Sequence, residues 1–212
     1  MLRSALAALV PRRNKAAVLP EDVVLTGERV ALRPLQEEDA GALFACASDA
    51  EVTRFLPWEP ARSVGAVRGF VGDQIRRRRE GDSMAFALLL RETGEMIGSI
   101  DLMDLKTEPG RAELGYLLRR SHWGRGLMTE GARLALQFGF ETLRLRRVVA
   151  FADAENWGSR RVLEKAGMTP WGSETRTVKS QKRLYIRYEI RRRDEKRGED
   201  GSAPSAAAST FA

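Results

Sequence analysis

The sequence predicts a single α/β (α+β) domain with a mostly antiparallel central sheet and helices on both faces. Three observations support this fold class. Short apolar or β-branched runs of strand length alternate with longer segments whose apolar residues recur at helical spacing. Glycine and proline separate these segments, as they do at turns. Within residues 111–141, a strand-like run also passes through a glycine-rich turn into a helix-like run.

The first half of the chain is expected to hold three strands and three helical segments. Pro34 ends the first strand, the acidic run Glu37–Asp39 suits the positive end of a helix dipole, and Glu92–Gly94 is a hairpin turn. The four arginines Arg76–Arg79 read as a solvated helix end rather than an RNA contact. The expected elements are a strand at 23–35, helices at about 37–48, 51–55 and 63–80, and strands at 84–90 and 95–102.

The second half is expected to add four strands and two helices. Gly167 stands where a helix commonly stops, one residue beyond its last turn. The alternation of the last two segments predicts a final antiparallel pair. The expected elements are a strand at 111–118, a helix at 127–141, a strand at 147–152, a helix at about 156–166, and strands at 168–177 and 183–190.

Positive charge is concentrated at the N terminus. The formal net charge is +7, and residues 1–20 contain four basic and no acidic side chains. We therefore divide the chain into a flexible basic N-terminal arm at 1–20, a folded domain at 21–190 and a disordered C-terminal tail at 191–212. The near-neutral body argues against a nucleic-acid-binding fold, whereas the arm could support association with the ribosome or another acidic surface.

Cysteine content and hydropathy indicate a cytoplasmic protein. The single cysteine, Cys46, excludes an intramolecular disulfide, and its place in a helix-like run indicates a buried structural thiol rather than a nucleophile. No apolar stretch is long enough to span a bilayer, so no membrane association is expected. The apolar start Met1–Val10 is short and lacks a convincing cleavage site, so it is interpreted as part of the arm rather than as a signal peptide. Export is the alternative. Composition does not decide between a monomer and a homodimer.

The turn at residues 120–130 predicts an anion site. A strand that runs through a glycine-punctuated turn into a helix leaves backbone N–H groups unpaired at the positive end of the helix dipole. Gly124 and Gly126 let the backbone approach the anion closely because they carry no Cβ. The passage therefore points to a phosphate-bearing ligand.

Four passages in order carry a resemblance to a known family. They are VALRPLQEED at 30–39, GEMIGSI at 94–100, AELGY at 112–116 followed by WGRGLMTE at 123–130, and ENWGSRRVLEKAG at 155–167. Over about residues 23–190 the chain resembles the acetyl-CoA-dependent GNAT N-acetyltransferase superfamily. The resemblance is closest to the branch of ribosomal-protein alanine N-acetyltransferases (RimJ/RimL-like). It implies a sheet whose middle strands splay apart around the pantetheine arm of acetyl-CoA, the acetyl donor.

The resemblance also implies the residues that contact coenzyme A. The family turn has the form Gln/Arg-x-x-Gly-x-Gly/Ala; here Trp123 stands at its first position and Met128 at its last, while the middle glycine is kept. Asn156 matches a residue that commonly bonds the pantetheine, although its position also suits a helix N-cap. The implied contacts are Trp123, Gly124, Arg125, Gly126, Leu127, Met128 and Thr129, main-chain groups of Leu117 and Leu118, and Asn156.

Three side chains are candidates for proton chemistry, one as the base and two as the acid. Glu113 matches the family's Glu-x-Gly-Tyr and is the candidate general base, with a structural salt bridge as the alternative. Leu163 stands where many members carry a tyrosine acid, so Ser159, one helical turn earlier, becomes the candidate acid. Tyr116 is a second candidate for that role, with packing as the alternative. Because His122 is the only histidine, a multi-His metal site is excluded, and no metal is expected.

These inferences predict an N-acetyltransferase acting on a primary amine acceptor. The expected acceptor is a protein or peptide N-terminal α-amino group, acetylated directly in a ternary complex with acetyl-CoA. Two alternatives remain open. One is acetylation of a small amine such as an antibiotic, polyamine or amino-acid derivative, because one fold serves many acceptors. The other is a non-catalytic acyl-CoA-binding protein.

Overall fold

The computed structural model describes residues 19–192, so most of the predicted arm and tail lies outside the described residues. Its centre is an eight-stranded sheet in the order β1-β2-β3-β4-β5-β6-β8-β7. Every neighbouring pair is antiparallel except β5 and β6, which confirms the predicted mostly antiparallel sheet. The strands are β1 (Leu25–Thr26), β2 (Val30–Pro34), β3 (Met84–Leu90), β4 (Met96–Met103), β5 (Arg111–Leu118), β6 (Arg147–Asp153), β7 (Thr169–Val178) and β8 (Gln181–Arg191).

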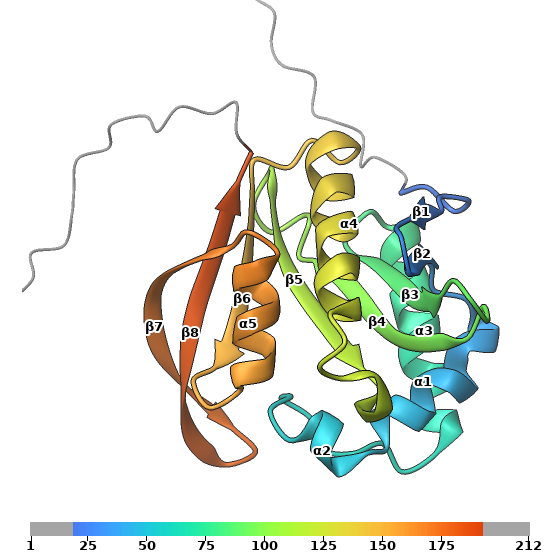
Figure 1. The fold of residues 1–212 in the computed structure, drawn as a ribbon, viewed down its shortest axis with the longest axis horizontal. Helices are drawn as coiled ribbons and strands as arrows, with labels where there is room; N and C mark the ends of the chain where they lie inside the picture. The colour runs from blue at the N-terminus through green and yellow to red at the C-terminus, as the bar shows by residue number, and fades with distance from the viewer. Residues whose placement is uncertain (1–18, 193–212) are drawn as a thin grey trace, which may run out of the picture.

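Helices cover both faces of the sheet (Figure 1). On one face lie α4 and α5, on the other lie α1 and α3, and α2 lies beyond the C-terminal end of β5. The helices are α1 (Ala40–Ala47), α2 (Ala50–Thr53), α3 (Val64–Arg79), α4 (Leu127–Glu141) and α5 (Trp157–Lys165), with 3-10 turns η1 (Glu37–Asp39) and η2 (Arg120–His122). No helix within residues 19–192 is both long and apolar enough to cross a membrane.

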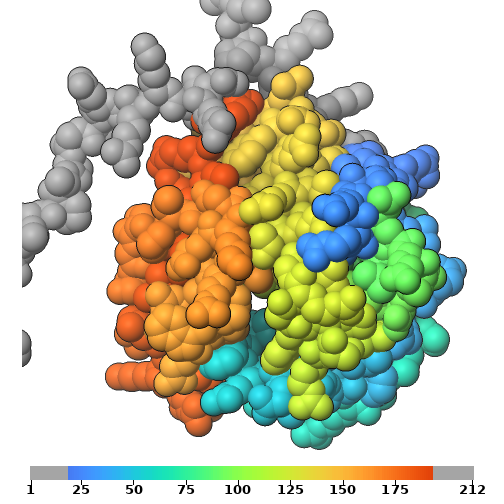
Figure 2. All heavy atoms as spheres, in the orientation of Figure 1, coloured from blue at the N-terminus to red at the C-terminus, as the bar shows by residue number. Residues whose placement is uncertain are grey.

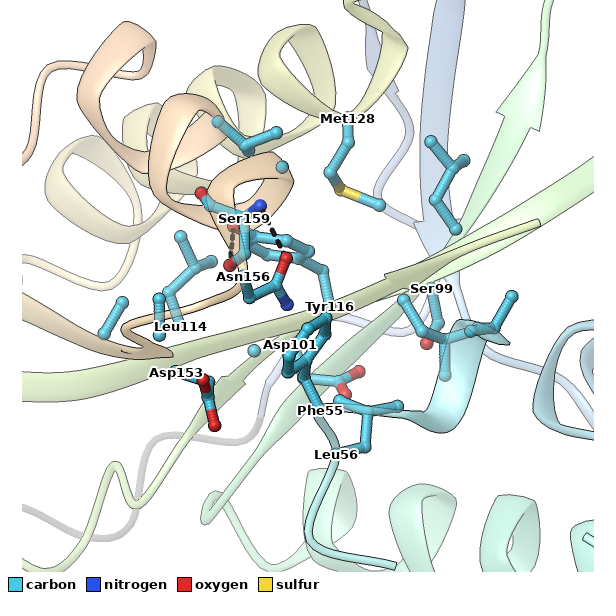
Figure 3. Close-up of a pocket in the computed structure, with 18 of the residues that line it drawn as sticks. Phe55, Leu56, Ser99, Asp101, Leu114, Tyr116, Met128, Asp153, Asn156 and Ser159 are labelled. Atoms are coloured by element: carbon cyan, nitrogen blue, oxygen red, sulfur yellow. Dashed lines mark hydrogen bonds between the residues drawn. The ribbon is translucent and has the colours of Figure 1, made fainter. Parts of the chain in front are cut away.

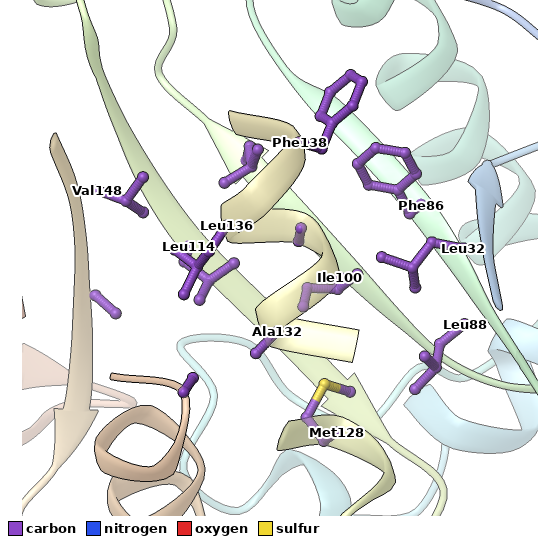
Figure 4. Close-up of a cluster of buried hydrophobic side chains, with 14 of the residues drawn as sticks. Leu32, Phe86, Leu88, Ile100, Leu114, Met128, Ala132, Leu136, Phe138 and Val148 are labelled. Atoms are coloured by element: carbon purple, nitrogen blue, oxygen red, sulfur yellow. The ribbon is translucent and has the colours of Figure 1, made fainter. Parts of the chain in front are cut away.

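The larger core lies between the sheet and α4 (Figure 4). Apolar residues of α4 recur along the side that faces the strands, so they are buried against the leucines and isoleucines of the sheet. Phe138 meets Phe86 of β3 edge to face, with ring centroids 5.3 Å apart. A second core under α1 and α3 fixes the opposite face. Cys46 of α1 is buried, as predicted.

Two sequence predictions are wrong. Residues 23–35 form two short antiparallel strands, because the chain reverses at Gly27, whose N–H donates to Val30 O at 2.9 Å. A Cβ at Gly27 would lie 2.5 Å from Glu130 Oε1, so the close approach of α4 requires glycine there. The arginine run at the end of α3 is not wholly solvated either. Arg78 is buried and donates to Leu35 O at 3.2 Å, which fastens α3 to the sheet.

The middle strands splay apart, as the resemblance implies. β5 and β6 pair only from Arg111 with Arg147 to Glu113 with Val149. Beyond that point they diverge toward α2, so the β6 side of residues 114–118 and the β5 side of residues 150–153 have no strand partner. These backbone groups therefore remain available to an inserted ligand.

Candidate active site

A cavity of about 1830 Å³ lies where β5 and β6 diverge. Figure 2 shows the surface hollowed between α5 and the segment that joins β5 to α4. All the predicted site residues except one line it: Glu113, Leu117, Leu118, Trp123, Gly124, Gly126, Leu127, Met128, Thr129, Asn156 and Ser159. The exception is Arg125, which lines a separate cavity of about 390 Å³ with Arg29 and Arg91.

The turn before α4 has the geometry expected of an anion site. Gly124 and Gly126 have φ values of 73° and 76°, in the left-handed region that favours glycine. Gly126 is the N-cap of α4 and has no side chain to accept from the first helical N–H groups. Leu127–Thr129, which supply those N–H groups, line the cavity. The turn therefore fits a phosphate group held by main-chain donors.

A carboxylate fixes this turn to the far edge of the sheet. Glu130 Oε1 accepts hydrogen bonds from Arg29 N at 2.7 Å and Val30 N at 3.3 Å, and Arg29 Nη1 donates to Arg125 O at 2.9 Å. Burial alone would raise the pKa of Glu130, but these bonds and the Arg29 charge lower it. This contact could not be predicted from the sequence, because its partners lie about a hundred positions apart.

The turn from β6 to α5 places the predicted polar residues of the second strand. Asn156 Oδ1 accepts from Ser159 N at 3.1 Å, so the N-cap interpretation is confirmed, while contact with a ligand stays a prediction. Asp153 is buried at the end of β6; its Oδ1 accepts from Glu155 N at 2.9 Å, and Arg183 lies 2.6 Å from its Oδ2. This pairing orders the turn that carries Asn156.

Two hydroxyl groups meet between β5 and α5 (Figure 3). Tyr116 Oη lies 2.9 Å from Ser159 Oγ, and it also donates to Ser159 O at 3.1 Å. Burial raises the pKa of Tyr116 above its ordinary value, so its phenol stays protonated across the neutral range. Leu163, which lines the cavity one turn further along α5, is buried and cannot donate a proton.

Two carboxyl groups line the opposite half of the cavity. Asp101 of β4 pairs with Gly115, and Met103 pairs with Glu113, so both acidic side chains lie on the α3 face of the sheet. Burial raises the pKa of Asp101 to about 7, although Arg77 acts against it. Burial also raises the pKa of Glu113, with Arg176 opposing. Sequence reasoning missed Asp101; the alternation Ser99-Ile-Asp-Leu102 was a signal, but only strand pairing places it on the same face as Glu113, diagonally across the two strands.

The tip of the β7–β8 hairpin closes this half of the cavity. Lys179 Nζ donates to Thr53 O at 2.9 Å, and Tyr185 Oη donates to Phe55 O at 3.4 Å. Trp58, on the loop that these bonds hold, lines the cavity and is 39% exposed. Within residues 19–192, no three His, Cys, Asp or Glu side chains are grouped to hold a metal ion.

Comparisons with known proteins agree with this geometry. The acetyltransferase (GNAT) domain model matches residues 29–169. The uncharacterized N-acetyltransferase p20 of Bacillus licheniformis is 33% identical over 161 residues, which cover 76% of this chain and 90% of that protein. The spermidine N(1)-acetyltransferase of Escherichia coli is 27% identical over 147 residues, covering 68% and 74%.

A solved structure of Mycobacterium smegmatis RimJ in complex with CoA-disulfide has a TM-score of 0.68 and 26% identity, and the match covers 79% of this chain and 84% of that one. The chain belongs to the GNAT acetyltransferase family and is an N-acetyltransferase. In this chain, the unpaired edges of β5 and β6 and the main-chain donors before α4 leave backbone groups available to a phosphate-bearing ligand.

Proposed function

We propose that the chain transfers an acetyl group from acetyl-CoA to the α-amino group of a protein or peptide N terminus. The two substrates are held together, so the amine attacks the thioester directly. Cys46 is not an acyl carrier, because it is buried and burial raises the pKa of its thiol. Residues 123–129 and Asn156 hold the coenzyme, and the acceptor binds beside Asp101 and Glu113.

The observation that carries this proposal is the place of Asp101, which lines the cavity on the same sheet face as Glu113; burial there raises its pKa to about 7. An α-amino group has a pKa of about 8 against about 10.4 for a lysine, so roughly a tenth of N termini but fewer than about one lysine in a thousand are neutral at pH 7. A base with a pKa near 7 can take the proton of such an amine with little loss of free energy. A primary amine of a polyamine resembles lysine and would need a stronger base.

The charges in the cavity also disfavour a polyamine. Asp153 and Glu155 face Arg183, and burial raises the pKa of both Asp101 and Glu113. Several cations line the same cavity: Arg54, Arg77, Arg161, Lys165 and Arg176. A molecule with several ammonium groups would therefore meet few unpaired negative charges.

Groups that flank the splayed strands stabilise the oxyanion, accept the amine proton and bind the leaving sulfur. The unpaired backbone N–H groups near Leu117 and Leu118 can stabilise the oxyanion that forms on the acetyl carbonyl. Asp101 accepts the amine proton, with Glu113 beside it as the second carboxylate. Ser159 donates a hydrogen bond to the sulfur that leaves. The basic arm at residues 1–20 is proposed to assist association with a ribosomal acceptor.

The test is thiol release measured with acetyl-CoA and three acceptor sets: peptides with free N termini, the same peptides with blocked N termini and an internal lysine, and spermidine. We expect turnover with free N termini only, rising with pH through 7. Turnover with spermidine or lysine above that with free N termini would overturn the proposed acceptor. Tight coenzyme A binding without turnover on any acceptor would instead indicate a non-catalytic binding protein.

A further inference from the structure

Tyr116 and Ser159 form a pair of hydroxyl groups whose hydrogen bonds can be arranged in two ways. The Tyr116 hydroxyl has one hydrogen and two acceptors at similar distances, Ser159 O at 3.1 Å and Ser159 Oγ at 2.9 Å. If it donates to the carbonyl, Ser159 Oγ donates back to Tyr116 and its hydrogen is occupied. If it donates to Oγ, the Ser159 hydrogen is released toward the cavity that both side chains line.

We propose that Tyr116 is a positioning residue for Ser159: by donating to Ser159 Oγ, it turns the Ser159 hydroxyl toward the departing sulfur of the coenzyme. The inference rests on the proposed role of Ser159. During transfer the new C–N bond forms, the C–S bond breaks, and sulfur keeps the electron pair while Asp101 holds the amine proton. The thiolate is stabilised by the Ser159 hydrogen bond and takes its proton from water on release.

Burial and placement suit Tyr116 to this role. Tyr116 lies on the core face of β5, opposite Ile100 of β4, so its ring is held by packing before any substrate binds. Because burial raises the pKa of its phenol, Tyr116 donates a hydrogen bond without losing its proton. Asn156 fixes the backbone of Ser159 from the other side through the N-cap bond. Two elements thus hold the donor in place, which is the condition for stabilising a charge that develops only during the reaction.

The test is the acidity of the coenzyme A thiol bound to the enzyme, followed by thiolate absorbance with the desulfo-coenzyme A complex as blank. A lost hydrogen bond to an anion weakens acidity roughly tenfold to a hundredfold. We expect both Tyr116→Phe and Ser159→Ala to raise the bound thiol pKa by about one to two units on this basis. The double variant should match Ser159→Ala, because Tyr116 acts only through Ser159.

Tyr188→Phe is the matched control. Tyr188 is also buried against α5, where its hydroxyl bonds Arg160 and Glu164, but it does not line the cavity. Tyr188→Phe should leave the pKa of the bound thiol unchanged. In turnover, Tyr116→Phe should lower kcat with the KM for acetyl-CoA unchanged.

A Tyr116→Phe titration equal to wild type, beside a shifted Ser159→Ala titration, would overturn the inference and leave Tyr116 a packing residue. If neither variant shifts the thiol pKa, Ser159 is not the sulfur partner and the inference also fails. The acceptor panel described above tests the acetyltransfer itself independently of both outcomes.

Discussion

Single residues in this site are tuned mainly by burial. The carboxyl groups of Asp101 and Glu113 lie on one face of neighbouring strands, and desolvation raises the pKa of each. Arg77 limits the shift at Asp101 and Arg176 limits it at Glu113. The surface carboxylate Glu108 behaves differently: its hydrogen bond from the Arg147 guanidinium lowers its pKa and outweighs the opposing effect of desolvation. Burial within the paired strands, not residue type, therefore decides which carboxylate can accept a proton near neutral pH.

Asp101→Asn should remove the base and change the pH dependence of both activity and stability. We expect kcat/KM to fall about 10²-fold to 10⁴-fold and to lose its rise through pH 7. The pKa is about 7 in the folded protein and 3.8 in the reference state, so the folded state holds the proton more tightly. Wild-type stability therefore decreases as pH rises from about 4 to 7, by up to about 4 kcal/mol, and the variant should lack this decrease.

Glu113→Gln is the control for Asp101→Asn, measured by pH–rate profiles and by urea unfolding at pH 4.5 and pH 8. The Glu113→Gln variant should keep the rise of kcat/KM through pH 7. If Glu113→Gln abolishes that rise while Asp101→Asn keeps it, Glu113 is the base, as the family resemblance implies.

Among the elements, the turn that starts α4 shows how local sequence can define a binding site. Its two left-handed glycines, the absent N-cap side chain and the first-turn N–H groups all follow from the stretch 123–129. The position of the turn does not. It depends on Glu130, which reaches the β1–β2 turn, and on Arg29, which holds Arg125 O. The turn can therefore be recognised from the sequence, whereas the contacts that hold it in place are visible only in the folded structure.

Gly126→Val should abolish coenzyme A binding while the protein stays folded. A β-branched residue at φ 76° is strained by about 1–2 kcal/mol and shields the first N–H groups of α4. Gly94→Val is a matched control, because Gly94 has φ 73° and open space around its Cβ position but lies in the β3–β4 turn, away from the cavity. Calorimetric titration should show affinity lost for the first variant and kept by the second, with similar losses in Tm. Equal affinities would refute the assignment of the turn.

At the scale of the whole molecule, the cavity exists because two parts of the sheet meet over a short length. β5 and β6 share three residue pairs and then separate. At the open end, the β7–β8 hairpin reaches across to the α2–α3 loop through Lys179 and Tyr185. The acceptor half of the site is therefore bounded by segments that lie more than a hundred positions apart in the chain.

Lys179→Ala should loosen this closure and raise the KM for the acceptor severalfold, with the dissociation constant of coenzyme A unchanged. The reason is that Lys179 bonds Thr53 O and lies 3.8 Å from Glu59, beside the proposed acceptor half, whereas the proposed coenzyme contacts lie in the turns before α4 and α5. Lys182→Ala, an exposed position on the same hairpin, is the control. A changed coenzyme affinity with an unchanged acceptor KM would contradict this division of the cavity.

The sequence alone determined the fold class, most element boundaries and the glycine turn before α4, because these depend on patterns within a few residues. Strand 111–118 and helix 127–141 were predicted at their observed limits, as local periodicity and turn glycines define them. The tertiary structure alone decided the rest: the split of the first strand, the burial of Arg78, the partnership of Tyr116 with Ser159, and the place of Asp101 on the same sheet face as Glu113. Each depends on strand register or on contacts between distant segments, which set burial and hydrogen bonding and cannot be read from local pattern.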